Sequence, residues 1–170
     1  MKDIRITGGC QCGAVRYALH SEPSKPAICH CRMCQKQSGS YFGAFTGVNA
    51  KDFEVTRGTI AYFQSSDDAR RGFCRDCGTP LTYEFLSKPR ICPTHGSLDE
   101  PWAIEPEIQV GIESRMPWLH KIMDLPASES GNDSFVPGDT PSRFELIRRT
   151  NRQHPDHDTE VWPPIEWAER

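Results

Sequence analysis

Cysteine is the residue type in this chain most suited to chemistry: eight are present, and seven of them fall into three short clusters. The stretch "GGCQCG" places Cys10 and Cys12 at C-x-C spacing, and "FCRDCG" places Cys74 and Cys77 at C-x-x-C spacing. A glycine after each pair permits a tight turn that directs backbone amides at the sulfurs. Four thiolates from two such turns form the ligand set of a closed, tetrahedral structural zinc site.

A metal held by these four cysteines would join two parts of the chain that lie far apart in sequence. Structural zinc contributes on the order of 10 kcal/mol to folding in small peptides. Two alternatives remain, a redox pair at Cys74 and Cys77 or simple buried thiols. A C-x-x-C redox pair is expected beside a βαβ unit, and the sequence shows no such unit.

The stretch "CHCRMC" contains the remaining cluster, Cys29, Cys31 and Cys34. If Cys29 and Cys31 leave the end of a strand and Cys34 lies in the first turn of a helix, the three sulfurs converge. The dipole at the helix N-terminus would then lower their pKa values. His30 lies between two of these cysteines, where strand alternation points its side chain away from the sulfurs.

Two residues could supply a fourth ligand for this cluster: Cys92, the eighth cysteine, and His95, three positions later. A lone cysteine in an apolar strand is more often a small buried hydrophobe, and a lone loop histidine is more often a hydrogen-bonding residue. If neither closes the site, the fourth position is open, as it is in catalytic zinc sites.

An open zinc site with three thiolates has a net charge near −1, which weakens its power to acidify water. Such a centre is better suited to accepting another thiol and holding it as a thiolate. Addition of that thiolate to a small aldehyde gives an S-hydroxyalkyl adduct, and the protein would contribute proximity and a thiol deprotonated at neutral pH. This chemistry indicates a thiol and an aldehyde as small-molecule partners.

The composition of the chain sets the context for these sites. Its 170 residues are typical of one domain with a tail, and lysine plus arginine number 20 against 23 acids, a formal net charge of −3. This balance argues against nucleic-acid binding. We find no secretory h-region and no apolar run of about 18 residues, so we expect no membrane span and a cytoplasmic location. In a reducing compartment, clustered cysteines indicate metal binding or catalysis rather than disulfides.

The elements that must position the cysteines are mostly short stretches of alternating apolar and polar residues, a pattern typical of strands. The clearest helix candidate is short, at 32–39. Strands are predicted at 4–7, 14–20, 42–47, 53–56, 60–65, 80–85, 90–94 and 107–113. The expected fold class is therefore mainly β, a β-sheet domain with short helices.

From Ala127 the composition becomes rich in serine, glycine, proline and acids. We therefore predict a zinc-binding domain at 1–126 and an irregular C-terminal extension at 127–170. Later apolar residues, among them Trp162 and Trp167, could strap the extension back over the domain.

The tail also contains an H-x-x-H pair, His154 and His157, in "RQHPDHDTE". Such a pair can bind a metal on a helix, but Pro155 argues against a helix here. We interpret this stretch as a loop or capping segment.

Five motifs in order carry a resemblance to a known family: "GGCQCGAVRY", "CHCRMCQKQSGS", "RRGFCRDCGTPL", "HGSLDEP" and "ESRMPWLHKIMDLP". Over roughly residues 5–126 the chain resembles the glutathione-dependent formaldehyde-activating enzymes, also described as S-(hydroxymethyl)glutathione synthase-like. The resemblance implies an Mss4-like, mainly β fold with two zinc ions. It implies a structural zinc on Cys10, Cys12, Cys74 and Cys77, and a catalytic zinc on Cys29, Cys31 and Cys34.

Other positions bear on the substrate. Members of this family often carry a histidine where Gln109 stands here. Four basic residues could meet the carboxylates of glutathione, although solvated surface is the simpler interpretation of each: Arg32, Lys36, Arg70 and Arg71.

The leading hypothesis is a zinc-dependent carbon–sulfur lyase-type enzyme that adds a thiol, such as glutathione, to a small aldehyde, such as formaldehyde, or reverses that addition. The second is a non-catalytic zinc-binding module that docks a partner protein through its aromatic tail. A third, an enzyme like the methionine sulfoxide reductases, needs a reactive cysteine outside the metal sites, and only Cys92 qualifies.

Overall fold

The computed structural model describes residues 4–129, 140–164 and 167. The smaller of its two β-sheets is antiparallel, with the strand order β1-β2-β5. Its strands are β1 (Ile6–Gly9), β2 (Arg16–Leu19) and β5 (Phe53–Arg57). They confirm the predicted strands at 4–7, 14–20 and 53–56, with shifted ends. The C-x-C turn therefore connects β1 to β2.

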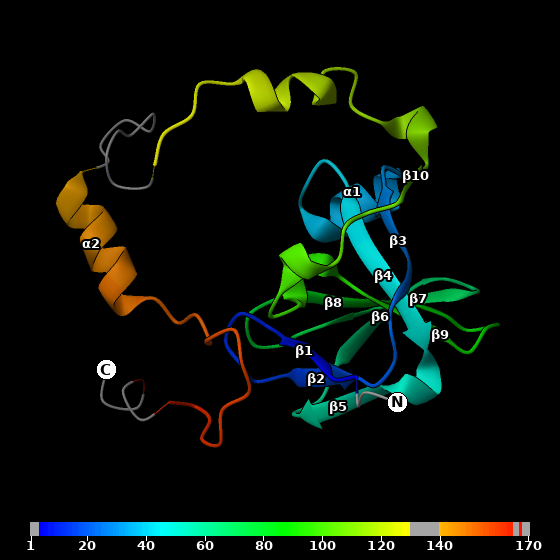
Figure 1. Ribbon diagram of the computed structural model, residues 1–170, viewed down its shortest axis with the longest axis horizontal. Coiled ribbons are helices and arrows are strands. Elements are labelled where there is room, and N and C mark those ends of the chain that lie inside the picture. Colours follow the sequence, from blue (N-terminus) through cyan, green and yellow to red (C-terminus); the bar gives the residue numbers. More distant parts are fainter. Residues whose placement is uncertain (1–3, 130–139, 165–166, 168–170) are drawn as a thin grey trace.

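The larger sheet has the strand order β10-β3-β4-β9-β8-β7-β6. β10 runs parallel to β3, and all other neighbours are antiparallel. Its strands are β3 (Ser24–Cys29), β4 (Gly43–Asn49), β6 (Ala61–Ser66), β7 (Ala69–Phe73), β8 (Pro80–Phe85), β9 (Arg90–Pro93) and β10 (Ile108–Val110). Figure 1 shows the smaller sheet below it. The mainly β fold class is confirmed.

The sequence pattern misses two of these strands, β3 and β7. In β3, Pro26 lacks a backbone donor and Lys25 has a φ of 52°, and the register with β4 shifts between Ser24 and Ala27. In β7, the sequence "ARRGF" has a composition typical of the surface. Pairing with β6 on one side and β8 on the other outweighs that composition.

The predicted helix is confirmed as α1 (Arg32–Ser38). It ends at Gly39, whose φ of 62° lets its N–H bond back to the carbonyl of Gln35. A second helix, α2 (Pro141–Thr150), begins after Thr140 and was concealed by the linker-like composition of the tail. Short 3-10 helices lie in the connections: η1 (Ala50–Asp52), η2 (His95–Ser97), η3 (Pro101–Ala103), η4 (Ile112–Ser114) and η5 (Leu119–Asp124).

The core between the sheets is small and includes two of the clustered cysteines. Tyr17 is fully buried, stacks on Phe53 at a ring separation of 5.1 Å, and shares a 2.7 Å hydrogen bond with the hydroxyl of Ser97. The buried core residues are Cys10, Ala14, Val15, Tyr17, Leu19, Val48, Ile60, Cys74, Leu81 and Leu98. Cys10 and Cys74 are therefore part of the packing that joins the sheets.

A buried ion pair fixes β2 against the loop after η2. Arg16 and Asp99 are both almost fully buried, and their two N–H···O contacts measure 2.8 and 2.5 Å. Thr7 also donates to Asp99 at 2.5 Å. Breaking such a pair by removing one partner costs about 3–5 kcal/mol, because the other charge stays buried.

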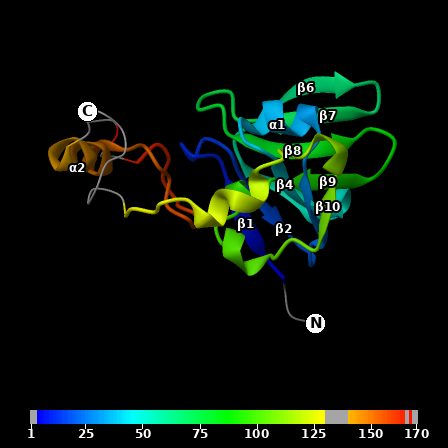
Figure 2. The ribbon, with the colours of Figure 1, turned by 90° about the horizontal axis from the view of Figure 1, so that it is seen from above.

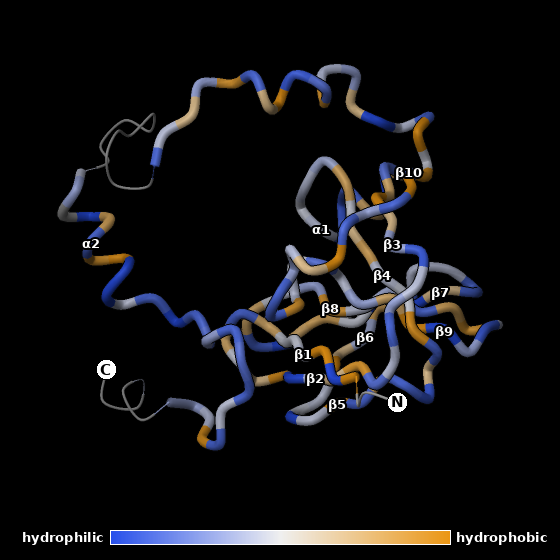
Figure 3. The backbone as a smooth tube through the Cα atoms, in the orientation of Figure 1, coloured by the Kyte–Doolittle hydropathy of each residue, from blue (hydrophilic) through white to orange (hydrophobic). Residues whose placement is uncertain are grey.

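The C-terminal part of the chain first leaves the sheets and then returns. Figure 2 shows α2 standing apart from them. Residues 153–162, which we call the C-terminal strap, come back to the β1–β2 end, and Figure 3 shows that the stretch after α2 is mostly hydrophilic. Within the described chain, no helix has the length and hydropathy that crossing a membrane requires.

Candidate metal centres

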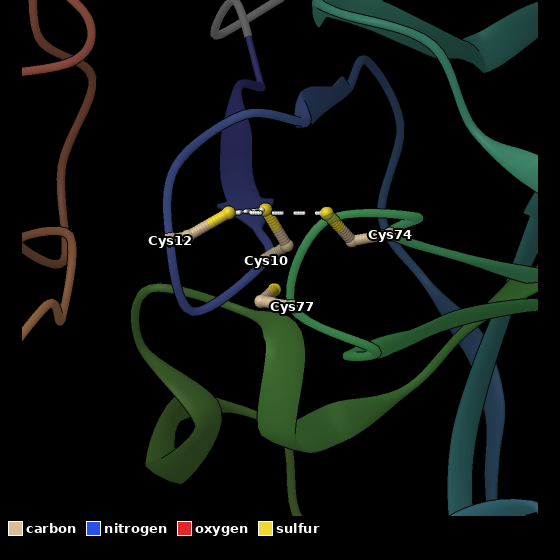
Figure 4. A group of neighbouring side chains, drawn as sticks. All are labelled: Cys10, Cys12, Cys74 and Cys77. Carbon is tan, nitrogen blue, oxygen red and sulfur yellow. Dashed lines mark hydrogen bonds between the residues drawn. The ribbon is translucent and has the colours of Figure 1, made fainter.

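The first cysteine cluster brings together Cys10, Cys12, Cys74 and Cys77 (Figure 4). All four Sγ atoms lie within 4.8 Å of one another, with 3.6 Å between Cys10 and Cys12 and 3.9 Å between Cys12 and Cys74. A tetrahedron with zinc–sulfur bonds of about 2.3 Å has sulfur–sulfur edges of about 3.8 Å. The arrangement therefore fits a four-sulfur zinc site, and all eight cysteines are free of disulfides.

Two tight turns hold these sulfurs. Gly13 has a φ of 78° and Gly78 a φ of 76°, so each glycine lies in the left-handed region that other residues avoid. The N–H of Gly13 bonds to the carbonyl of Cys10, and the N–H of Gly78 bonds to the carbonyl of Cys74. The amide of Val15 points at the sulfur of Cys10, 3.2 Å away. The expected glycine turns are thus present, and backbone amides face sulfurs of the cluster as expected.

The pKa values of the thiols in this cluster are shifted in different directions. Burial raises the pKa of Cys10 and raises that of Cys12 to about 11. Burial also disfavours the Cys77 thiolate, but hydrogen bonds from the side chain and backbone of Thr79 outweigh it and lower the pKa of Cys77 to about 6. Four sulfurs this close cannot all be thiolates in a buried site without a positive ion between them.

The C-terminal strap covers the turn that carries Cys10 and Cys12. The backbone N–H of His154 donates to the carbonyl of Gln11 at 2.7 Å, and the indole of Trp162 donates to the carbonyl of Cys12 at 2.6 Å. Asp158 pairs with Arg16 at 2.9 Å. The tail thus contacts the first cluster directly. The sequence of the tail did not predict where it would contact the domain.

Gly13→Ala is expected to detach the strap as well as strain the turn. A Cβ at Gly13 would lie 2.1 Å from Cδ2 of the buried His154. The left-handed conformation adds about 1–2 kcal/mol. We expect limited proteolysis to cut within residues 153–162 several-fold faster than in the wild type.

Gly78→Ala is the matched control for this prediction. Gly78 has nearly the same φ in the equivalent turn, but a Cβ there would have no atom within 4 Å. It should therefore carry the backbone strain without releasing the strap. Equal cleavage rates in the two variants would show that His154 does not anchor the strap at Gly13.

The second cysteine cluster lies at the junction of β3 and α1. Cys29 is the last residue of β3, Cys31 caps α1, and Cys34 lies in its first turn. The three Sγ atoms lie within 4.8 Å of one another, with 3.5 Å between Cys29 and Cys31. This is the strand-to-helix arrangement expected from the spacing, and three soft sulfur donors suit zinc.

A second segment closes over this junction from β10. Gly111 has a φ of 64°, and a Cβ there would lie 2.9 Å from the backbone N of Cys31. The side-chain amide of Gln35, which is buried, donates to the carbonyl of His30 at 2.6 Å and to that of Ser114 at 2.9 Å. Gln35 therefore ties β3, α1 and η4 together around the three sulfurs.

Neither candidate fourth ligand joins the cluster. The group of ligand atoms around Cys31 contains no atom of Cys92 or His95 among the described residues. His95 is buried, and burial lowers its pKa. His30 is also outside the group, as strand alternation predicted, and its Nε2 lies 2.9 Å from Oε1 of Gln109. In the described chain, three cysteine sulfurs thus converge here without a fourth candidate ligand atom.

The four basic residues considered for glutathione lie in different settings. Arg70 pairs with Glu84 at 2.7 Å, and Arg32 bonds to Gln35. Lys36 is exposed on α1. Solvated surface is the wrong interpretation of Arg71: it is only 4% exposed, and its guanidinium donates to the sulfur of Cys34 at 3.5 Å. The alternation of β7, which places Ala69 and Arg71 on one face, is the signal that could have found it.

The pKa values of the three thiols in this cluster shift in different directions. Burial raises the pKa of Cys29 and raises that of Cys34 to about 12. Burial also disfavours the Cys31 thiolate, but hydrogen bonds from the backbone and thiol of Cys34 lower the pKa of Cys31 below its ordinary value. As in the first cluster, full deprotonation requires a cation.

One family model matches the part of the chain that contains both cysteine clusters. The family model of the glutathione-dependent formaldehyde-activating enzymes matches residues 5–114, which contain both clusters. The chain belongs to this family. Its members act on small-molecule thiols and aldehydes, and the family is associated with zinc.

Two further proteins are similar to this family member. An uncharacterized lyase of Schizosaccharomyces pombe is 32% identical over 80 residues, which are 47% of this chain and 58% of the lyase. The chain thus spans little more than half the length of that relative. A crystal structure of a Rhodobacter sphaeroides protein is 23% identical, with a TM-score of 0.48, over 61% of this chain and 97% of that one.

Three remaining candidate residues of this formaldehyde-activating family member lie outside both cysteine clusters: His154, His157 and Cys92. Both ring nitrogens of His154 have partners, the carbonyl of Pro155 and the hydroxyl of Thr159, and His157 belongs to no cluster of metal-ligating side chains in the described chain. Burial raises the pKa of Cys92, which argues against a reactive thiolate there.

Proposed function

We propose that this chain is a zinc-dependent carbon–sulfur lyase-type enzyme that joins a thiol to a small aldehyde or reverses that addition. Glutathione and formaldehyde are the substrates that the family favours. The observation that carries the proposal is the cluster of Cys29, Cys31 and Cys34, where three converging sulfurs lack a fourth protein ligand among the described residues. We assign the first cluster to a structural zinc.

The proposed reaction is balanced without a redox partner. A carbon–sulfur bond forms between the thiol sulfur and the aldehyde carbon, and the thiol proton ends on the aldehyde oxygen as a hydroxyl group. When bound by the three cysteines, zinc would keep a substrate thiol deprotonated at neutral pH. Proximity supplies the remaining advantage, because two small reactants are held together.

Two contacts hold the backbone around the cluster in place. Gln35 holds the carbonyls on either side of the cluster, and the close approach of Gly111 to Cys31 limits movement of the β3 end. Arg71 donates a buried hydrogen bond to the sulfur of Cys34. We also propose the following division of the chain: residues 1–126 form the zinc-binding domain, and residues 127–170 form an extension from which the strap returns.

Two-dimensional exchange NMR on glutathione and formaldehyde tests the proposal. The uncatalysed reaction is appreciable, so the informative quantity is the exchange rate above that of buffer. We expect metal-loaded protein to accelerate exchange and the same protein after chelation of its metal to lose that acceleration. Equal rates with metal-loaded protein and buffer would reject the glutathione–formaldehyde activity, and the same assay would then be run with other thiols and aldehydes.

One observation favours the alternative, a non-catalytic docking module. Apolar side chains before and after β10 are strongly exposed, among them Trp102 at 75% and Met123 at 90%. Trp162, which suggested docking through the tail, is 37% exposed, and its indole donates a hydrogen bond to the carbonyl of Cys12 in its own chain. Absence of thiol–aldehyde exchange together with retention of two metal ions would favour this alternative.

A further inference from the structure

Arg71 is a buried cation whose anion is not a carboxylate. It lies in the middle of β7 with only 4% of its surface exposed. No ion pair within 4.0 Å involves it among the described residues, whereas its neighbour Arg70 pairs with Glu84. The guanidinium instead contacts three groups: Sγ of Cys34 at 3.5 Å, Oε1 of Gln37 at 3.5 Å, and the ring of Tyr83 at 4.9 Å.

A buried guanidinium requires a nearby negative charge, because an unpaired buried charge is strongly destabilising. The oxygen of Gln37 and the face of Tyr83 carry only partial charges. Among these three described contacts, Cys34 is the one that can carry a full charge, as a thiolate bound to a metal, because burial raises the pKa of the Tyr83 hydroxyl. The surroundings of Arg71 therefore match a cluster whose sulfurs are deprotonated and bound to a metal.

The positive charge of Arg71 also affects how much negative charge the metal-bound cluster can hold. Three thiolates and one zinc ion sum to about −1, and a fourth thiolate from a substrate would bring the sum to about −2. A fixed positive charge beside Cys34 offsets one of these charges in a site where water screens little. We propose that Arg71 is a positioning residue whose buried charge lets the cluster of Cys29, Cys31 and Cys34 accept a substrate thiolate as its fourth ligand.

This inference rests on the proposed function, and it gives Arg71 a role different from binding the carboxylates of glutathione. On binding, the thiol would release its proton to solvent and its sulfur would take the fourth position. The aldehyde oxygen would take up a proton from solvent when the carbon–sulfur bond forms, so that the overall reaction balances. A neutral thiol therefore distinguishes the two roles, because it has no carboxylate that Arg71 could bind. We choose 2-mercaptoethanol as that probe.

The test uses the full chain loaded with cobalt(II), whose visible and sulfur-to-metal absorption bands report the ligands of each site. 2-Mercaptoethanol is titrated into the wild type and into Arg71→Met, Arg71→Lys and Lys36→Met. Arg71→Met removes the charge but keeps most of the volume, and Arg71→Lys restores the charge. Lys36→Met removes the same charge from an exposed position on α1, two residues beyond Cys34.

We expect Arg71→Met to keep two cobalt equivalents and to bind 2-mercaptoethanol at least about tenfold more weakly than the wild type. Arg71→Lys should recover part of that loss, and Lys36→Met should bind as the wild type does. Unchanged thiol affinity in Arg71→Met would overturn the inference. Loss of the second cobalt from both Arg71 variants would also overturn it, because Arg71 would then support the three cysteines themselves. A wild type that binds a single cobalt would instead reject the second metal site and the proposed function with it.

Discussion

Cys31→Ser is expected to remove one of two metal equivalents and to reduce thiol–aldehyde exchange above background by at least about 100-fold. Cys31 lies between the end of β3 and the start of α1 and has the lowered pKa of its cluster. A serine hydroxyl is a poor ligand at neutral pH, so two thiolates would remain. Metal content and exchange NMR on the same preparations measure both effects.

Cys92→Ser is the matched control, because it makes the same chemical change outside both clusters. We expect it to keep two metal equivalents and the wild-type exchange rate. A Cys31→Ser variant that loses a metal but keeps its exchange activity would contradict the proposed catalytic role of the second cluster. Loss of activity in Cys92→Ser instead would favour a cysteine-based mechanism at β9.

The double variant Cys74→Ser/Cys77→Ser is expected to lose the first metal and the cooperative thermal unfolding transition. Structural zinc contributes on the order of 10 kcal/mol, which is comparable with the whole stability of an ordinary domain, about 5–15 kcal/mol. The loss is large here because the cluster lies inside the packing between the sheets, where Cys10 and Cys74 are buried. Metal analysis and circular dichroism on heating measure the two effects.

A double variant that does not fold in the cell gives no melting curve, so chelation of the folded wild type provides the second measurement. Removal of metal with a strong chelator should proceed in two steps, and the step that empties the first cluster should coincide with loss of the transition. Retention of that transition in metal-free wild type would show that packing and the Arg16–Asp99 pair suffice to hold the sheets together.

Short sequence patterns are enough to predict the two groups of cysteines and the local shape of each. The C-x-C, C-x-x-C and C-x-C-x-x-C spacings act within a single turn, where covalent geometry and glycine conformation decide where a sulfur points. For the same reason the helix after Cys31 and eight of the ten described strands were predictable from short patterns. The ordered motifs also carried the family, which the match over residues 5–114 shows.

How residues far apart in the chain meet depends on the assembled sheets, and short patterns do not predict it. Whether Cys92 or His95 closes the second cluster depends on the packing of β9 and η2, and no local pattern encodes that packing. The composition of "ARRGF" indicated surface, yet pairing on both sides of β7 buried Arg71 beside Cys34. The strap reached the first cluster through contacts with Gln11 and Cys12, more than a hundred residues earlier in the chain. Such contacts depend on the whole fold, because burial and charge pairing are properties of the assembled sheets and not of any one segment.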